Sequence, residues 1–255
     1  MSMLDNANWH KRFLQQAGWT RNLRNYLLEK IELPENADIL DVGCGTGALF
    51  VDFEHRQDTY IGLDLDHNRL AYAQAHFVDT NLICAKGEKM PLRNRSFDLV
   101  FCHYLLLWIQ HPAQLLKEMC RVSRKGGIVA AFSEPDYQAR VDHPEVFQKL
   151  GQLQNHSLQE QGVNLSIGRQ LNQLFHQAGL VDVHSGVLGG EWSNDPQSKL
   201  SFEGEWEMLV HDLSAYLTAA EINAYKANAQ ETWLTGNKTL YILSLIHISE
   251  PTRPY

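Results

Sequence analysis

The sequence has few cysteines and no pattern that would pair them or bind a metal. Its four cysteines, Cys44, Cys84, Cys102 and Cys120, form no C-x-x-C pair, and its twelve histidines include no H-E-x-x-H or comparable ligand spacing. We therefore expect neither a disulfide framework nor a metal site. Unpaired thiols are typical of a reducing cytoplasm.

Long hydrophobic runs and an excess of positive charge are also missing. No apolar segment reaches membrane-spanning length, and residues 1–11 lack the apolar core of a signal peptide. The formal net charge is -8. Because a long nucleic-acid tract is bound by clustered Lys and Arg, this balance disfavours nucleic acid as a partner. We expect a cytoplasmic protein with no membrane association.

Short apolar segments alternate with amphipathic ones through the first half of the chain. Hydrophobic periodicity predicts strands at residues 37–42, 59–63, 81–85, 97–103 and 127–133, with helices at 66–77 and 111–123. Asp66 is placed to cap the first of these helices. Alternation of this kind is typical of βαβ units, and hence of a parallel sheet with helices on both faces.

The flanking segments predict further helices and a lid. Helical patterns cover residues 10–31, 145–161, 168–178 and 203–233, with strands at 180–188 and 239–243. We expect a single domain at residues 1–243, with a cofactor-binding core at 35–135. The helical lid is expected to consist of residues 1–33, 137–175 and 200–235.

The last residues differ in character from those before them. Residues 245–255 read L-I-H-I-S-E-P-T-R-P-Y, which resembles a sequencing adapter translated in frame. We expect residues 244–255 to be an artefactual tail that replaces the natural C-terminus.

A glycine-rich turn follows the first predicted strand. It reads Asp41-Val42-Gly43-Cys44-Gly45-Thr46-Gly47 and precedes a predicted helix, and Asp64 ends the next strand 21 positions after Gly43. Glycines let a ligand lie against bare backbone at a helix N-terminus. An acid about 20 residues further on is suited to gripping ribose hydroxyls. The pattern predicts a nucleoside cofactor, and a glycine turn that binds nothing is the plainer alternative.

Charge indicates which nucleoside cofactor fits. The spacing is G-x-G-x-G, whereas a dinucleotide fingerprint is G-x-G-x-x-G. Asp41 would repel a pyrophosphate by about 4 kcal/mol at 4 Å in an effective dielectric of 20. The same carboxylate suits the ammonium and sulfonium of S-adenosylmethionine. An NAD-linked oxidoreductase is therefore the weaker alternative.

These motifs resemble those of the class I S-adenosylmethionine-dependent methyltransferases over roughly residues 35–135. The resemblance rests on D-V-G-C-G-T-G at 41–47, G-L-D at 62–64, M-P-L at 90–92, S-F-D-L-V at 96–100, E-M-C-R-V at 118–122 and K-G-G at 125–127. It implies an α/β fold with a doubly wound, mostly parallel, seven-stranded Rossmann-like sheet. It also implies methyl transfer from S-adenosylmethionine to a small-molecule acceptor by in-line displacement.

The resemblance also implies where the cofactor lies. Its methionine part is expected at the glycine loop, its ribose at Asp64 and its adenine near Gly87 and Glu88. Many relatives carry an acid where Lys86 stands, and a lysine cannot accept from the adenine amino group, so a non-catalytic S-adenosylmethionine-binding protein stays an alternative. The expected cofactor-binding residues are Asp41, Gly43, Cys44, Gly45, Thr46, Gly47, Asp64, Leu65, Gly87, Glu88 and His103.

Candidates for the acceptor side follow the fourth and fifth predicted strands, because open α/β sheets bind ligands at the carboxyl ends of their strands. His103 is the candidate catalytic base, or it lines the cofactor through its backbone. Glu134 and Asp136 are suited to a cationic acceptor or to capping the next helix. Tyr104, Tyr137 and Trp19 are the remaining candidate substrate-binding residues. An N-P-P-Y element is missing and the chain is acidic, which disfavours DNA and RNA as methyl acceptors.

Overall fold

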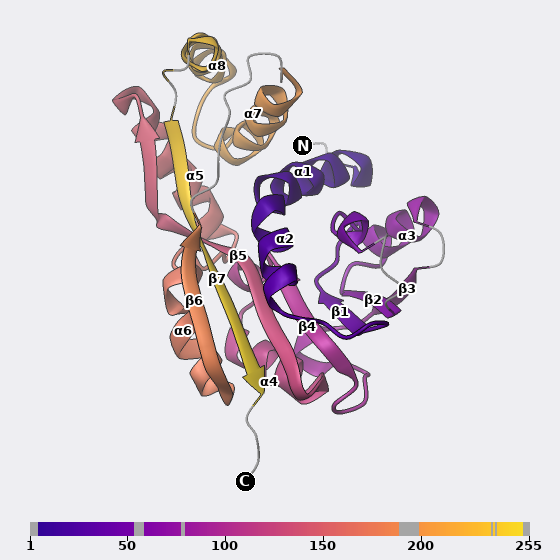
Figure 1. Cartoon of the computed structure of the whole chain (residues 1–255). Helices are drawn as coiled ribbons and strands as arrows, with labels where there is room; N and C mark the ends of the chain where they lie inside the picture. The colour runs from indigo at the N-terminus through magenta and orange to yellow at the C-terminus, as the bar shows by residue number, and fades with distance from the viewer. Residues whose placement is uncertain are drawn as a thin grey trace.

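The centre of the molecule is a seven-stranded sheet with the order β3-β2-β1-β4-β5-β7-β6 (Figure 1). The computed structural model describes residues 5–53, 59–77, 80–188, 199–235, 237 and 239–251. The strands are β1 (Asp38–Val42), β2 (Thr59–Asp64), β3 (Asn81–Cys84), β4 (Phe97–His103), β5 (Ser123–His143), β6 (Leu180–Leu188) and β7 (Thr239–Pro251). In this order, each neighbouring pair among β3, β2, β1, β4 and β5 is parallel. Strand β7 pairs antiparallel with both β5 and β6. The predicted doubly wound, mostly parallel, seven-stranded sheet is confirmed.

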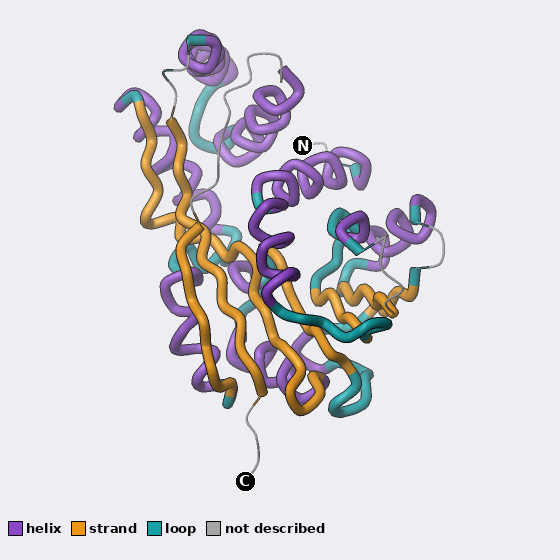
Figure 2. Tube along the Cα trace, in the orientation of Figure 1, coloured by secondary structure: helices purple, strands orange, loops and turns teal. Residues whose placement is uncertain are grey.

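The helices connect these strands and cover the sheet (Figure 2). They are α1 (Asn6–Trp19), α2 (Arg21–Lys30), α3 (His67–His76), α4 (Pro112–Val122), α5 (Gln148–Glu160), α6 (Ile167–Gln177), α7 (Lys199–Leu213) and α8 (Ala219–Leu234). Asp66 caps α3 as predicted, because its Oδ1 accepts the backbone N–H groups of Asn68 and Arg69 at 2.9 and 3.3 Å.

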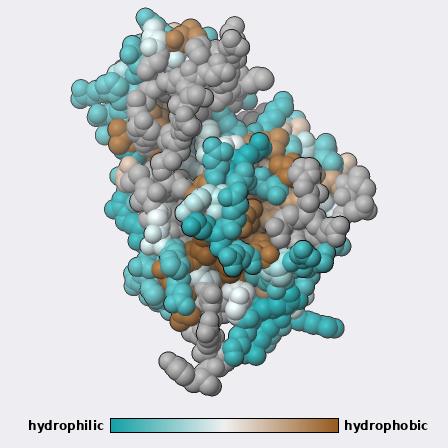
Figure 3. Space-filling model, in the orientation of Figure 1, coloured by the Kyte–Doolittle hydropathy of each residue, from teal (hydrophilic) through white to brown (hydrophobic). Residues whose placement is uncertain are grey.

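The central strands are buried on both faces. In β1 and β4, Leu40, Val100 and Cys102 join a core cluster with α4 and α6. Their neighbours Ile39, Leu99 and Phe101 join a second cluster that includes α1 and α2 residues on the opposite face. Since alternate side chains of a strand point to opposite faces, this division explains why the strands are almost continuously apolar. Figure 3 shows mainly hydrophilic residues on one outer face, with hydrophobic ones in smaller patches near its middle.

Helices α5, α7 and α8 pack together, and α5 also packs against β5. They share their own apolar cluster with the short turn at Glu145–Phe147, and this cluster includes Phe147, Phe202 and Trp206. Strand β5 extends beyond the sheet centre and pairs there with the first residues of β7. We call α5, α7 and α8 the upper helices.

The fold differs from the sequence expectation at the N-terminus, where residues 10–31 form two helices. The break falls at Thr20, which leaves the helical conformation with φ -112° and ψ 5°. Gly18 weakens the end of α1 because glycine is a poor helix former. Helix α2 then packs against the sheet through Leu23, Leu27 and Leu28, so it covers the sheet and is not part of a lid.

Two further segments differ from the expectation. Residues 167–175, expected in the lid, belong to α6, which packs on β5, β6 and β7 because Leu171 and Phe175 are fully buried in the sheet core. The helix expected directly after the glycine loop is a short 3-10 turn at Phe50–Asp52. Its backbone bonds join residues three apart, as in Phe50 N to Gly47 O at 3.1 Å and Phe53 N to Phe50 O at 3.0 Å.

Strand β7 runs to Pro251, beyond the expected end at residue 243. It includes residues 244–251, which belong to the tail that the sequence predicts to be artefactual. Main-chain pairing requires no particular side chains, so alternating residues of many kinds can occupy this strand. Among the helices that the structure describes, none combines the length and apolar character needed to cross a membrane.

Candidate active site

The glycine loop lies at the carboxyl end of β1, next to β2. Gly43, Gly45 and Gly47 have φ angles of +80°, +55° and +80°, which side-chain-bearing residues rarely adopt. The backbone N–H groups of Gly43 and Cys44 donate to Leu63 O at 2.6 and 3.1 Å. A Cβ atom on Gly43 would lie 2.7 Å from Leu105 Cδ1. The loop therefore presents bare backbone where the end of β1 approaches the loop after β4.

Asp64 at the end of β2 is held against this loop. Its Oδ2 accepts the N–H of Gly45 at 2.8 Å, and its Oδ1 accepts the N–H of Asp66 at 2.8 Å. The residue is 8% exposed. Each carboxylate oxygen keeps a further lone pair, so a ligand with two hydroxyl groups can still donate to it. Leu65, the next residue, is exposed at the rim.

Asp41 is the second acid below the loop. It is 2% exposed, and its Oδ2 accepts the hydroxyl of Tyr60 at 2.7 Å. Burial raises the pKa of Asp41 to about 7, the hydrogen bond from Tyr60 opposes this shift, and the neighbouring charge of Asp64 adds to it. Asp41, expected from the sequence to be charged, is thus partly protonated near neutral pH.

Helix α1 covers the loop, a feature that the sequence analysis did not foresee. His10 Nδ1 lies 2.9 Å from Thr46 Oγ1, and a Cβ on Gly45 would lie 3.3 Å from the Phe13 ring. Phe13 stacks with Trp9 at 5.5 Å between ring centroids. The available signal was the position of His10 on the same helical face as Phe13 and Ala17, since a polar residue on a buried face needs a partner.

His103 at the end of β4 is tied to the junction of α1 and α2. Its Nε2 lies 2.9 Å from Thr20 Oγ1, and Thr20 also accepts from the guanidinium of Arg24. Burial lowers the pKa of His103 well below its usual value, and the charge of Arg24 lowers it further. His103 is therefore neutral at physiological pH. The ring of Tyr104 meets it edge-on at 4.8 Å, and Tyr104 itself has a φ of +52°.

Glu134 and Asp136 of β5 already have partners inside the protein. Glu134 is 0% exposed, and its carboxylate accepts the N–H groups of Leu105 and Leu107 at 2.9 and 3.3 Å, so it anchors the loop after β4. Asp136 is 3% exposed and receives both Nε and Nη2 of Arg169 at 2.5 and 2.9 Å. Both side chains are thus directed at protein groups, whereas the sequence left open a cationic acceptor or the cap of the next helix as their partner.

The expected adenine segment forms a short 3-10 turn at Gly87–Lys89. A Cβ on Gly87 would lie 2.6 Å from Leu115 Cδ1, so only glycine fits between this turn and α4. Glu88 is half-buried, and its backbone oxygen accepts from Gln114 Nε2 at 3.4 Å. Lys86 is exposed.

Cys44, in the glycine loop after β1, is buried, and this burial raises the pKa of its thiol.

Trp19 at the end of α1 and Tyr137 on β5 are both partly buried. The guanidinium carbon of Arg12 lies 4.9 Å from the centre of the Trp19 ring. The backbone of Tyr137 is fixed on both sides, because its N–H donates to Leu165 O at 2.8 Å and its oxygen accepts from Asn155 Nδ2 at 3.1 Å. Burial raises the pKa of Tyr137.

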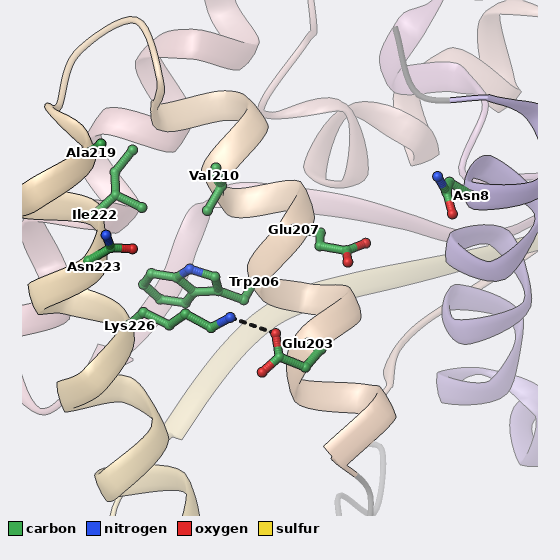
Figure 4. Close-up of a pocket in the computed structure, with 9 residues that line it drawn as sticks. All are labelled: Asn8, Glu203, Trp206, Glu207, Val210, Ala219, Ile222, Asn223 and Lys226. Atoms are coloured by element: carbon green, nitrogen blue, oxygen red, sulfur yellow. Dashed lines mark hydrogen bonds and ion pairs between the residues drawn. The ribbon is translucent and has the colours of Figure 1, made fainter. Parts of the chain in front are cut away.

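A pocket of about 530 Å³ opens between α7, α8 and the start of α1 (Figure 4). Glu203 and Lys226 form an ion pair of 2.6 Å across its floor, whereas Glu207 points toward the side where Asn8 lies. Trp206, Val210, Ala219, Ile222 and Asn223 complete the lining. Over the part of the chain that the structure describes, no cluster of His, Cys, Asp and Glu is suited to a metal ion.

The segment that contains the glycine loop, Asp41 and Asp64 matches a known protein family. Residues 40–131 match the family described as a methyltransferase domain. The chain is 37% identical over 108 residues to a malonyl-[acyl-carrier protein] O-methyltransferase of Marinomonas sp. (strain MWYL1), covering 40% of this chain and 40% of that protein. It is 28% identical over 242 residues to a biotin biosynthesis bifunctional protein of Cellvibrio japonicus (strain Ueda107), covering 92% of this chain and 43% of that protein.

A solved structure shares the fold. It is the Haemonchus contortus phosphoethanolamine N-methyltransferase 2 in complex with phosphomonomethylethanolamine and S-adenosylhomocysteine, with a TM-score of 0.58 and 16% identity, covering 92% of this chain and 53% of that one. The chain spans less than half the length of the two curated relatives named above. The family match at residues 40–131 includes the glycine loop and Asp64.

Proposed function

We propose that the chain is a class I S-adenosylmethionine-dependent methyltransferase, in line with the methyltransferase-domain match over residues 40–131, and that it transfers a methyl group from S-adenosylmethionine to a small-molecule acceptor. The observation that carries the proposal is the pairing of Asp64 with the glycine loop. Its carboxylate is fixed by Gly45 N–H and still has lone pairs for ribose hydroxyls. The chain covers less than half the length of the named curated relatives, so their acceptors are not assigned to this chain.

The residues present fit S-adenosylmethionine. The positive φ angles of Gly43, Gly45 and Gly47 turn the loop sharply at the end of β1, and the buried acid below it, Asp41, changes charge near neutral pH. A cation close to Asp41 favours its ionised form, so cofactor binding and deprotonation of Asp41 support each other. A pyrophosphate would have the opposite effect, which is why the same pair of acids disfavours NAD.

The protein's own contribution is alignment and exclusion of water. S-adenosylmethionine supplies a methyl group on a sulfonium, and the C–S electron pair stays on sulfur as S-adenosylhomocysteine leaves. The acceptor contributes the lone pair that forms the new bond. Helix α1 covers the loop through Phe13 and His10, which shields the site from solvent.

Where the acceptor must also lose a proton, we assign its uptake to His103. With Nε2–H donated to Thr20 Oγ1, the Nδ1 lone pair is free to accept a proton. Its neutral state at physiological pH suits a general base. An acceptor that is already ionised needs no such step, and His103 then only lines the site.

Calorimetric titration with S-adenosylmethionine, S-adenosylhomocysteine and NAD tests the proposal. We expect micromolar binding of both adenosyl ligands and no binding of NAD. Asp64→Asn should weaken adenosyl binding at least tenfold, because an amide offers only one acceptor oxygen to two backbone donors and to the ribose. Asp66→Asn is the matched control, since asparagine caps a helix as well as aspartate does. NAD binding, or no adenosyl binding by a folded protein, would overturn the proposal.

A non-catalytic S-adenosylmethionine-binding protein is the second candidate, and the exposed Lys86 in the adenine segment is the feature that favours it. Release of S-adenosylhomocysteine during an acceptor screen separates the two functions. Adenosyl binding without turnover on any acceptor would support the second.

A further inference from the structure

The loop after β4, residues 104–108, lies directly against the glycine loop. A Cβ on Gly43 would lie 2.7 and 2.9 Å from Cδ1 and Cδ2 of Leu105, so the Leu105 side chain packs on the main chain of Gly43. Near the end of β4, Cys102 pairs with Val42 of β1, the residue before Gly43. The loop after β4 therefore covers the place where β1 ends and the glycine loop begins.

The start of this loop is capped by a residue from another strand. Residues Leu106–Trp108 form a 3-10 turn whose N-cap residue, Leu105, makes no side-chain cap. The first N–H groups of a helical turn have no acceptor within it, and leaving them buried and unpaired is costly. Glu134 of β5 supplies the acceptors, because its Oε1 accepts the N–H of Leu105 at 2.9 Å and its Oε2 that of Leu107 at 3.3 Å.

A bulge in β5 turns Glu134 toward this loop. Regular alternation would put Glu134 on the face of Phe132, which packs with residues of α1 and α2. The carboxylate instead lies 3.8 Å from the thiol of Cys102, which belongs to the core cluster of the opposite face. The change of face falls at Ser133, which has a φ of +60°, where the register with β7 shifts between Ala131 and Glu134. Bulges commonly re-aim a side chain in this way.

Holding Glu134 in this position costs folding free energy. Its side chain is 0% exposed, and burial raises its pKa to about 7, although the N–H groups of residues 105–107 oppose that rise. Cys102 beside it stays a neutral thiol, because burial and the charge of Glu134 raise its pKa. Ser133 adds a left-handed backbone and a buried hydroxyl without a hydrogen-bond partner among the described residues. An apolar residue would fill the space without these costs, so the arrangement points to the loop that it holds.

We propose that Glu134 is a positioning residue for S-adenosylmethionine, which fixes the loop after β4 against the glycine loop so that Leu105 forms a wall of the cofactor site. In this role Glu134 acts through Leu105 and touches neither the cofactor nor the acceptor. The far side of the loop is held separately, since Leu107 O accepts the N–H of Asn164 at 2.9 Å. This inference rests on the proposed function, because it names a residue that shapes the same site.

Glu134→Gln tests the inference, because an amide accepts through one oxygen and turns a donor toward the second N–H group. Asp142→Asn is the matched control, since it makes the same acid-to-amide change on the same strand, in a carboxylate whose partner is Arg140. Hydrogen exchange of the full chains is followed by mass spectrometry at pH 8, where Glu134 is mostly ionised. We expect exchange at residues 105–107 to be at least tenfold faster in Glu134→Gln and to change less than twofold in Asp142→Asn.

Calorimetric titration with S-adenosylhomocysteine is the second readout on the same proteins. The dissociation constant should rise at least fivefold in Glu134→Gln and change less than twofold in Asp142→Asn. Leu105→Ala removes the wall but keeps the backbone N–H groups and Glu134, so it should raise the dissociation constant at least fivefold without faster exchange at residues 105–107. A merely structural role would instead speed exchange throughout β4 and β5 and leave the affinity of the folded protein unchanged.

Each outcome decides the role of Glu134. Unchanged exchange at residues 105–107 or unchanged affinity in Glu134→Gln, an equal loss in Asp142→Asn, or full affinity in Leu105→Ala would overturn it. If Glu134→Gln does not fold, Glu134→Asp replaces it with the same expectations, because it keeps the charge and shortens the reach by one methylene. Failure of the parent chain to bind S-adenosylhomocysteine overturns the proposed function together with this role, whereas binding that Glu134→Gln retains in full overturns the role alone.

Discussion

The hydroxyl of Tyr60 on β2 donates a 2.7 Å hydrogen bond to Oδ2 of Asp41 on β1, a carboxylate that is 2% exposed. The two strands are adjacent and parallel, so the bond joins them below the glycine loop. A single neutral donor does not replace the water that a carboxylate loses on burial, and the pKa of Asp41 rises to about 7. The site thus holds an acid whose charge costs folding free energy.

The first prediction concerns the pH dependence of stability at Asp41. Its folded pKa of about 7 exceeds the ordinary value of 3.8, so the folded state binds the extra proton between these values and stability falls as pH rises through this window. Asp41→Asn removes the penalty. We expect the variant to be more stable than the parent by on the order of 2 kcal/mol at pH 8, or about 4–8 °C in Tm.

The control for this prediction is the same comparison at pH 4, close to the ordinary value of 3.8, where most of the stability gain should be lost because the folded carboxyl is then protonated and the unfolded one is only partly ionised. Thermal melts at the two pH values measure it. The same variant should bind S-adenosylmethionine more weakly, since it lacks the anion. A gain at pH 4 as large as that at pH 8 would contradict the assigned cause.

The buried ion pair of Arg24 and Asp52 gives the second prediction. The two side chains are 2% and 5% exposed and lie 2.7 Å apart. Asp52→Asn leaves the guanidinium buried without a counter-charge, and we expect a loss of about 3 kcal/mol of unfolding free energy. Glu203→Gln breaks the Glu203–Lys226 pair, whose side chains are 46% and 33% exposed, and should cost less than about 1 kcal/mol. Urea denaturation of both variants measures the difference, and equal losses would refute the argument from burial.

A third prediction separates backbone strain from contact in the glycine loop. Gly43 and Gly126 both have positive φ angles, +80° and +75°, but a Cβ would lie 2.7 Å from Leu105 only at Gly43 and would meet nothing within 4 Å at Gly126. Both alanine variants should lose about 1–2 kcal/mol through strain. Gly43→Ala should in addition lose adenosyl binding at least tenfold, whereas Gly126→Ala should retain it. Calorimetric titration checks this, and retained binding in Gly43→Ala would show that the ligand does not approach that position.

The fourth prediction concerns the ionisation of His103. Burial and the charge of Arg24 hold its pKa well below the usual 6.5. Its ring carbon–proton signals, assigned by their loss in His103→Gln, should therefore not titrate between pH 6 and 8. The protonated ring is disfavoured in the folded state, so its contribution opposes folding only as pH falls below 6.5. Two-dimensional NMR over a pH series gives the value, and a midpoint at or above 6.5 would remove the case for a neutral base.

Much of the architecture followed from local pattern. The strands at 97–103 and 180–188 have the predicted bounds, and Asp66 caps α3 as expected. These features are local, since strand burial follows from a run of apolar residues and a cap follows from one side chain and the next three backbone groups. The glycine loop and Asp64 were likewise visible, because their spacing is fixed by the strand–turn–strand connection.

The pairing of polar side chains with one another could not be predicted from local sequence. The sequence showed Glu134 and Asp136 near the end of a strand, and it showed Arg12, Thr20 and Arg24 on N-terminal helices. It did not show that Asp136 meets Arg169, that Arg24 meets Asp52, or that Thr20 reaches His103. Each pair joins residues that are distant in the chain.

The sequence by itself determined the sheet, the loop and the cofactor class, because periodicity and turn chemistry act over a few residues. Only the tertiary structure decided which charges are neutralised inside the fold and which remain for a ligand. Burial and pairing depend on what packs against a residue from distant segments, and they set the protonation of Asp41 and His103.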